Sequence, residues 1–235
     1  MGERLKAIYV ARFREDMTRE AGGRYWTDVH APMADALDGM VGYVQSHVVG
    51  PVAGGEDSAE AIGFDGFACE WWRDRPTFEA GMSSEAWAVI VADGPEFLET
   101  ASLGGMSGVV SERVLVDGPP GPYKLAYFVR FREGMDIGEA EAGWLAVGGP
   151  LGADQRGLVR HIQNLVVGSL GAGGVIGSQR AGFDGLAELW FEDGAAAREC
   201  EAALAGGALE RLEFLEPWPG ASMCARVGER VIIEP

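Results

Sequence analysis

The 235-residue chain is poor in cysteine and in positive charge. Its three cysteines, Cys69, Cys200 and Cys224, include no CxxC pair, so the sequence indicates neither a disulfide framework nor a structural zinc site. Lysine and arginine total 19 against 36 aspartate and glutamate residues, which gives a formal net charge of −17. This charge repels phosphate backbones and anionic lipids, so we expect no nucleic-acid partner and no membrane partner.

Long apolar runs and common cofactor motifs are also missing. No stretch approaches the roughly 20 apolar residues that cross a bilayer, and no export signal is visible, so a cytoplasmic location is predicted. The 36 glycines form no phosphate-binding loop, and there is no GxSxG elbow. We therefore expect no nucleotide cofactor, and nothing in the sequence requires a metal. With 47% hydrophobic residues, it should fold around a substantial core. Because the negative charge disfavours phosphate and lipid partners, the expected partner is a small neutral molecule of hydrophobic character.

What the chain does contain is an internal repeat. The segment YVARFREDM, which begins at Tyr9, returns as YFVRFREGM from Tyr127, at an offset of 127 − 9 = 118. With the offset increased by one, GFDGFACEWWRD from Gly63 matches GFDGLAELWFED from Gly182. The proline- and glycine-rich stretch at residues 117–122 is typical of a linker. We predict two domains, residues 1–117 and 123–235.

The spacing of the apolar residues and the positions of glycine and proline predict the order βαββαβ within the first unit. Strands are expected at residues 6–13, 41–49, 66–73 and 109–116, and helices at 18–37 and 78–99, the second interrupted near Asp93. Residues 51–63 form a glycine-rich excursion. The predicted fold class is α+β, with tandem ferredoxin-like units that form an intramolecular dimeric α/β barrel with helices outside. The protein should be a monomer through this internal pairing, or a homodimer.

Four motifs, RYWTDVHAPMAD, GYVQSHVV, FDGFACEWW and DGPEFL, occur in the order and spacing of the EthD-like family. The resemblance covers nearly the whole chain, twice, and is stronger in the first half. Members of this family in the dimeric α/β-barrel superfamily are typically cofactor-independent cyclases, dehydratases, decarboxylases or oxygenases of aromatic polyketides, or accessory proteins of ring and ether degradation. The resemblance therefore implies an enzyme of secondary metabolism.

Polar residues that differ between the two units are candidates for chemistry, because the shared fold does not require them. Tyr43, Gln45 and His47 alternate along a predicted strand and should share one face. His30 lies on the preceding helix, and the family often has histidine there. We predict His30 and His47 as proton-transfer groups and Tyr43 as a hydrogen-bond donor. The second unit has Gly148, Leu165 and His161 at these three positions.

Glu70 is the fourth predicted catalytic residue. It shares a strand face with Ala68 and Trp72, where the second unit has only apolar residues, and burial would raise its pKa. The adjacent Cys69 is interpreted as a packed hydrophobe, although a strand bulge would exchange the two faces. Besides Gln45, the predicted substrate-binding residues are aromatic: Trp26, Trp72, Trp87 and Phe67.

Each prediction has an alternative. His30 could be a surface histidine and His47 a hydrogen-bonded strand histidine, or both could join a carboxylate in a metal triad, which their spacing does not require. The favoured function is acid/base catalysis of cyclisation, dehydration or isomerisation on an aromatic or polyketide-type molecule in the first unit. A cofactor-free monooxygenase of the same fold and a non-catalytic binding protein are the alternatives.

Overall fold

The computed structural model describes residues 4–51, 63–99, 106–146, 155–170, 176–177, 182–205, 212–216 and 224–235. Nearly all of the predicted glycine-rich excursion at 51–63 lies outside these ranges. The first half contains β1 (Leu5–Ala11), α1 (Arg19–Tyr25), β2 (Met40–Pro51), β3 (Gly66–Trp72), α3 (Arg75–Met82), α4 (Glu85–Asp93) and β4 (Ser107–Val116). The second contains β5 (Tyr123–Val129), α6 (Ile137–Ala146), β6 (Leu158–Leu170), β7 (Ile176–Gly177), β8 (Gly185–Phe191), α7 (Gly194–Ala205) and β9 (Cys224–Ile233).

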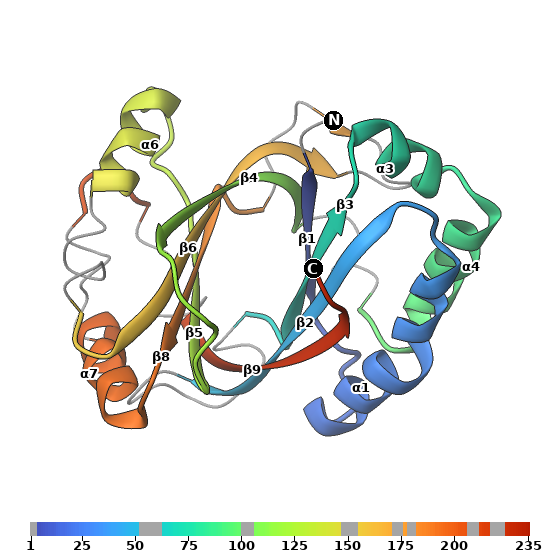
Figure 1. The fold of residues 1–235 in the computed structure, drawn as a ribbon, viewed down its shortest axis with the longest axis horizontal. Helices are drawn as coiled ribbons and strands as arrows, with labels where there is room; N and C mark the ends of the chain where they lie inside the picture. The colour runs from blue at the N-terminus through green and yellow to red at the C-terminus, as the bar shows by residue number, and fades with distance from the viewer. Residues whose placement is uncertain are drawn as a thin grey trace.

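The described strands form one antiparallel sheet that closes on itself. Their order is β4-β1-β3-β2-β9-β5-β8-β6-β7, and an additional pairing joins β4 to β6. Eight strands therefore make a ring, with the short β7 attached to β6. The helices of the first half lie outside this ring on one side, and α6 and α7 lie outside it on the opposite side (Figure 1). The predicted α+β class and closed barrel with external helices are confirmed.

The register of the strands repeats around the ring. Ser46 lies opposite Glu229 where β2 meets β9, and Glu112 lies opposite Asn164 where β4 meets β6. Offsets of 164 − 46 = 118 and 229 − 112 = 117 convert the first pair into the second. Within the halves, β1 pairs with β3 and β4, and β5 pairs with β8 and β9. The pairing pattern of residues 5–116 thus occurs again in residues 123–233.

The second predicted helix, at 78–99, differs from the structure at its start and in its middle. It begins at Arg75 because Asp74 forms a capping box with Thr77, in which Thr77 N donates to Asp74 Oδ1 at 2.9 Å. A break follows at Ser83 and Ser84, where the hydroxyl of Ser84 caps a new helix by accepting from the backbone N–H of Trp87 at 3.1 Å. Two helices therefore replace the predicted one.

The first predicted helix, at 18–37, changes its winding along its length. Thr18 caps α1, and the chain then widens into a π-helical turn (η1, Trp26–His30) and tightens into a 3₁₀ segment (η2, Ala31–Ala36). The π-turn is marked by the backbone N–H of Ala31, which donates to Trp26 O five residues earlier. Such single π-turns frequently occur at functional sites.

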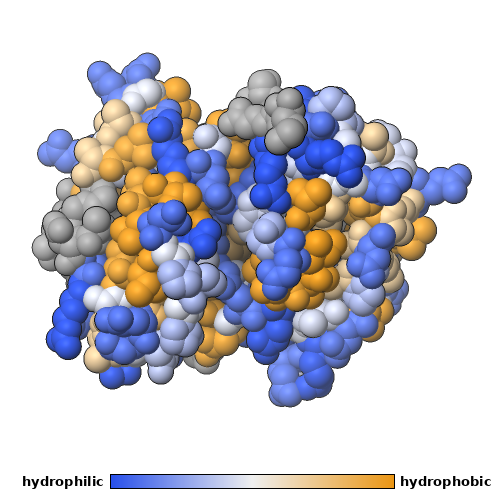
Figure 2. All heavy atoms as spheres, viewed as in Figure 1, coloured by the Kyte–Doolittle hydropathy of each residue, from blue (hydrophilic) through white to orange (hydrophobic). Residues whose placement is uncertain are grey.

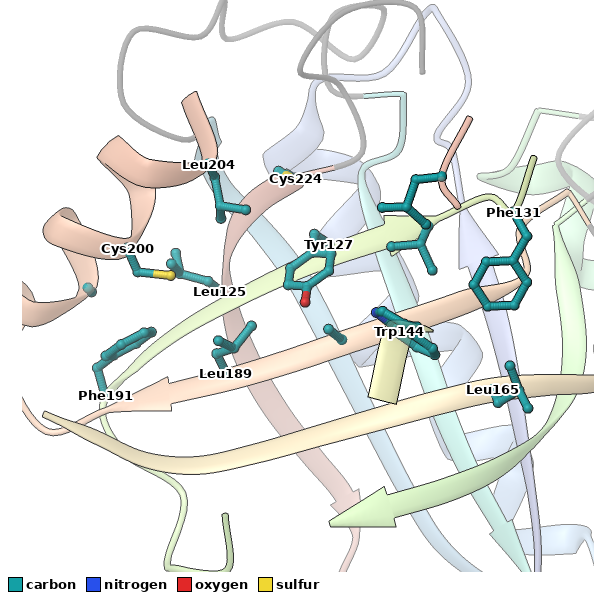
Figure 3. Packing of buried hydrophobic residues seen from close by; sticks show 14 of the residues in the cluster. Leu125, Tyr127, Phe131, Trp144, Leu165, Leu189, Phe191, Cys200, Leu204 and Cys224 are labelled. Carbon is teal, nitrogen blue, oxygen red and sulfur yellow. The ribbon is translucent and has the colours of Figure 1, made fainter. Parts of the chain in front are cut away.

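The buried side chains of the described residues form three regions: one apolar layer between the sheet and the helices of each half, and the interior of the barrel. Between the second half's sheet and helices, Leu125, Tyr127, Leu189 and Phe191 pack with Trp144 (Figure 3). A corresponding layer in the first half lies beneath α1, α3 and α4. The barrel interior is the third region, and it contains side chains from both halves, including Phe64, Phe67, Phe128 and Phe183.

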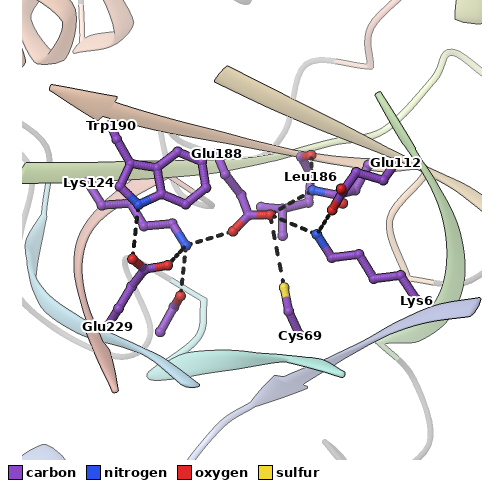
Figure 4. Close-up of polar contacts among 10 residues, drawn as sticks. Lys6, Cys69, Glu112, Lys124, Leu186, Glu188, Trp190 and Glu229 are labelled. Atoms are coloured by element: carbon purple, nitrogen blue, oxygen red, sulfur yellow. Dashed lines mark hydrogen bonds and ion pairs between the residues drawn. The ribbon is translucent and has the colours of Figure 1, made fainter. Parts of the chain in front are cut away.

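The barrel interior also contains a buried ion network that sequence reasoning missed. Glu188 accepts hydrogen bonds from Lys124 Nζ at 2.6 Å and Lys6 Nζ at 3.3 Å, and each lysine binds a second carboxylate, Glu229 or Glu112 (Figure 4). Burial alone would raise the pKa of Glu188, but the two lysines lower it to about 2. Ionisable side chains from both halves of the chain therefore meet in the barrel interior.

On the face of the molecule seen in Figure 2, hydrophobic side chains gather in two groups that flank a mainly hydrophilic strip across the middle.

Among the helices in the described ranges, none combines the length and the apolar character that crossing a bilayer requires.

Candidate functional site

The predicted polar row on β2 faces the first helix and forms one hydrogen-bonded network. Gln45 is fully buried, at 0% exposure, and lies at its centre. The amide nitrogen of Gln45 donates to Tyr43 Oη at 2.8 Å and to the backbone carbonyl of Trp26 at 3.3 Å. Its carbonyl oxygen accepts from Thr27 Oγ1 and His47 Nε2, each at 3.0 Å. The prediction that Tyr43, Gln45 and His47 share a face is confirmed.

This network fixes the hydrogen positions of His47. The Gln45 Nε2 group donates to two oxygens, which identifies the atom facing His47 as the amide oxygen; because an amide oxygen can only accept, Nε2 of His47 carries the proton in this contact. Burial lowers the pKa of His47 to about 4, with a smaller contribution from the positive charge of Arg230. The imidazole is therefore neutral near neutral pH. Its contacts suit it to hold Gln45 in place better than to exchange a proton.

Tyr43 is the residue whose hydroxyl this network orients. Its oxygen accepts hydrogen bonds from Trp26 Nε1 at 3.1 Å and from Gln45 Nε2 at 2.8 Å. Burial raises its pKa, so the phenol keeps its proton. Among the described residues, no acceptor for the Tyr43 O–H is present. The hydroxyl is thus able to donate a hydrogen bond to a bound molecule.

Glu70 lies beside Tyr43 on the same face of the sheet. On β3 it is flanked by Ala7 of β1 and Tyr43 of β2, and its side chain is buried. Burial raises its pKa to about 7, and a hydrogen bond from Trp72 Nε1 at 3.3 Å only partly opposes this. A carboxyl group with this pKa can accept or release a proton near neutral pH.

The structure resolves which of two adjacent residues faces this layer. Cys69 points into the barrel interior, with its sulfur 4.0 Å from Glu188 Oε1, and burial raises its pKa. No bulge exchanges it with Glu70, since both strand neighbours of β3 keep an unbroken register at these positions. Cys69 is a packed thiol, as expected from the sequence.

His30 belongs to a second polar group, in the helical layer. Its Nδ1 lies 2.8 Å from Asp93 Oδ2, and Tyr25 Oη donates to Asp93 Oδ1 at 2.8 Å. Asp93 Oδ2 is the acceptor in this contact, so Nδ1 of His30 carries the proton and Nε2 keeps its lone pair. Burial lowers the pKa of His30, and Asp93 opposes this shift. A neutral histidine held in this way is suited to act as a base.

Aromatic rings connect the two polar groups. Phe97 lies 4.8 Å from His30 and 6.5 Å from Trp26 between ring centroids, and Trp26 in turn donates to Tyr43. No hydrogen bond joins His30 to the Gln45 network in the described residues. His30 and His47 therefore bind separate partners rather than a shared carboxylate, and no cluster of three possible metal ligands occurs in the described ranges.

The predicted aromatic residues divide between the two faces of the sheet. Trp26 and Trp72 contact the polar groups directly, and the ring of Trp87 lies 6.1 Å from that of Tyr9 in the same layer. Phe67 faces the barrel interior, where it packs edge-on against Phe128 at 5.7 Å. Phe67 alternates with Ala68 along β3, so its side chain lies on the opposite face of the sheet from Glu70 and Tyr43.

Sequence reasoning missed several residues of this layer. Thr27 and Tyr25 were overlooked, and Asp93 was interpreted only as part of a helix interruption. The DGPEFL motif that contains Asp93 lies 63 positions from His30, and no spacing rule connects them. The aspartates of the repeated FDG motif, Asp65 and Asp184, have a structural role, because each accepts from a backbone N–H, that of Phe13 or Phe131.

Residues 14–101 match the EthD domain model. This match lies within the first half and contains the polar layer described above. No curated protein sequence is significantly similar to the chain.

Solved structures show the same fold over nearly the whole chain. An anthrone oxidase-like protein has a TM-score of 0.58 at 14% identity, over 98% of this chain and 93% of its own. A candidate monooxygenase from Fusobacterium nucleatum has a TM-score of 0.52 at 8% identity, with coverages of 98% and 93%. A candidate chlorite dismutase has a TM-score of 0.50 at 13% identity, with coverages of 97% and 96%. At these identities the likeness establishes the fold alone.

Proposed function

We propose that the first half is a cofactor-independent, EthD-like enzyme unit that moves protons on a hydrophobic aromatic or polyketide-type molecule. The observation that carries this proposal is the pairing of Glu70, whose pKa is raised to about 7, with the adjacent Tyr43, whose hydroxyl is free to donate. One group can remove a proton from carbon, and the other can stabilise the charge that develops on a nearby oxygen.

The second half, in this proposal, is a diverged copy that completes the barrel. The repeated strand register and the similar sequence offsets of 117 to 119 support a tandem of two ferredoxin-like units, residues 1–117 and 123–235. Leu189 stands where the first half has Glu70, opposite His161 in place of Tyr43. The second half therefore lacks the carboxyl group on which the proposed proton transfer depends.

A reaction follows from these groups. Ionised Glu70 takes a proton from a carbon next to a carbonyl, and the Tyr43 O–H donates to the oxygen on which the enolate charge collects. His30 is the second proton-transfer group, with Asp93 fixing its tautomer and orientation. Return of the proton to another atom completes an isomerisation, and loss of water or attack on a second carbonyl gives dehydration or cyclisation. Trp26, Trp72 and Trp87 provide flat apolar surface for an aromatic substrate.

A second candidate, a cofactor-free monooxygenase, is favoured by the comparisons. An anthrone oxidase-like protein and a candidate monooxygenase share the fold over nearly the whole chain. The same deprotonation by Glu70 would produce a carbanion able to react with molecular oxygen. The two candidates share the first step and differ in what consumes the carbanion.

Anthrone is a suitable probe, since its acidic methylene group lies across the ring from its carbonyl. Under nitrogen in D₂O, the wild-type chain should accelerate exchange of the methylene hydrogens, as followed by NMR. Glu70→Gln should lower this acceleration by roughly 10²-fold or more. The same change at an exposed helix position, Glu79→Gln, is the matched control and should have no effect.

The same experiment in air distinguishes the two reactions, because oxygen uptake coupled to exchange identifies the monooxygenase. The enzymatic proposal is wrong if the protein binds anthrone but does not accelerate hydrogen exchange, so that the wild type and Glu70→Gln both show the uncatalysed rate. The protein would then be a binding protein of the accessory class.

A further inference from the structure

The second half contains buried polar atoms that the first half's chemistry does not use. We propose that the layer between β6, β8 and their helices is a separate ligand site, in which His161 and Gln163 hold an uncharged, mainly apolar molecule through its hydroxyl group. This site would exist whether or not Glu70 catalyses proton transfer.

The unpartnered atoms are the starting point. His161 is only 1% exposed, and neither Nδ1 nor Nε2 has a hydrogen-bond partner in the described part of the chain. Gln163 is 2% exposed, and its Oε1 is likewise unpartnered, although its Nε2 donates to the carbonyl of Trp144 at 3.1 Å. Buried polar groups nearly always have a partner, because leaving one unsatisfied is costly. A single external hydroxyl group can accept from the His161 N–H and donate its one hydrogen to Gln163 Oε1, so it would satisfy two of these three atoms.

Comparison with the first half shows how these atoms lost their internal partners. The equivalent Gln45 uses its carbonyl oxygen to accept from Thr27 and His47. At offset 118, these two positions are Leu145 and Leu165 in the second half. The glutamine is thus retained while both donors to it are replaced by leucine. As a result, Gln163 Oε1 is an acceptor in an apolar layer, and no donor in the described part of the chain binds to it.

The surroundings define the chemical class of the ligand. Next to His161, Leu189 and Leu125 lie side by side on the same sheet face, and both belong to the apolar cluster that contains Phe191 and Trp144 (Figure 3). Burial lowers the pKa of His161 to about 4, so the ring is neutral, with one N–H donor and one acceptor nitrogen. A hydroxyl group can both donate and accept, and a neutral aromatic body suits the leucine and aromatic side chains. A charged ligand would lose its hydration without gaining a counter-ion.

The test uses 2-naphthol, an uncharged aromatic alcohol, titrated into the full chain by isothermal calorimetry. In His161→Leu, binding at the second-half site should weaken by about 10-fold or more, the effect of losing one good hydrogen bond. His161→Gln keeps a donor and an acceptor and should retain most of the affinity. Tyr43→Phe is the matched change in the first half and should leave this binding event intact.

An NMR measurement makes the outcome independent of binding stoichiometry. The chain has three histidines, so ¹⁵N-labelled imidazole signals can be assigned to His161 by their loss in His161→Leu. Addition of 2-naphthol should shift these signals. Unchanged His161 signals, together with equal isotherms for wild type and His161→Leu, would mean that a buried water satisfies the ring, and the proposal would be overturned. This result does not depend on whether Glu70 catalyses hydrogen exchange on anthrone, so the two proposals can fail separately.

Discussion

Exchanging Cys69 and Glu188 is the sharpest test of how the barrel is held together. Glu188 lies between Lys6 and Lys124, and Cys69 occupies the equivalent position of the first half at offset 119. The sulfur of Cys69 is 4.0 Å from Glu188 Oε1, so a carboxylate introduced at position 69 would extend into the same space. The double variant Cys69→Glu/Glu188→Cys moves the negative charge to the other half without changing the composition of the core.

The size of the effect follows from the pKa of Glu188, which falls from 4.5 to about 2 in the folded protein. That difference corresponds to about 3 kcal/mol of unfolding free energy, which agrees with the ~3–5 kcal/mol lost when one partner of a buried ion pair is removed. Glu188→Gln and Glu188→Cys should therefore each destabilise the protein by about 3 kcal/mol at neutral pH. The double variant should recover at least half of this loss.

Urea unfolding measured across the acid range provides the assay. Because the folded pKa is depressed, the contribution of Glu188 is fully present above about pH 4.5 and is lost as the pH falls through about 2. The difference between wild type and Glu188→Gln should shrink over that window. A loss below about 1 kcal/mol for Glu188→Gln, or a double variant no more stable than Glu188→Cys, would refute the reasoning.

Three further predictions concern the first-half layer. Glu70→Gln should stabilise the protein by about 3 kcal/mol at high pH and leave its stability unchanged near pH 4.5. The reason is that the raised pKa of Glu70 makes the stability of the wild type fall as the pH rises through about 7, and urea unfolding at both pH values measures the difference. Tyr43→Phe should lower anthrone exchange by roughly 10–10²-fold with little change in anthrone affinity, measured by calorimetry. Asp93→Asn should move the His30 limb of the pH–rate profile to lower pH, since Asp93 raises the pKa of His30 against the effect of burial; an unmoved limb would remove His30 from the mechanism.

Local patterns predicted the parts of this structure that depend on local geometry. A two-residue period was enough to place Tyr43, Gln45 and His47 on one face, and the contrast with Leu189 was enough to single out Glu70. Closure of the ring could be expected from the repeat, because each sheet has a second face to bury. Helix ends were less predictable, since Ser84 starts a helix inside what appeared to be one continuous segment.

Contacts between distant segments could not be read from the sequence. Lys6 and Glu188 are 182 positions apart, and a lysine near the start of a strand is ordinarily a solvated residue. The pair of His30 and Asp93 requires the π-turn and the end of α4 to meet, which neither segment indicates by itself. Phe67 shows the opposite problem: its aromatic character suggested a binding role, while strand alternation assigns it to the barrel interior.

The lone carboxylate shared by two lysines has a consequence for how such a barrel can evolve. An assembly of two identical subunits must present every side chain in duplicate about its symmetry axis, so a glutamate at this point would bring a second, repelling glutamate with it. Because the two halves here belong to one chain, equivalent positions can hold different residues, as Cys69 and Glu188 do. A single glutamate, Glu188, can then bind both lysines, each of which also has its own second carboxylate, while a small thiol fills the complementary space.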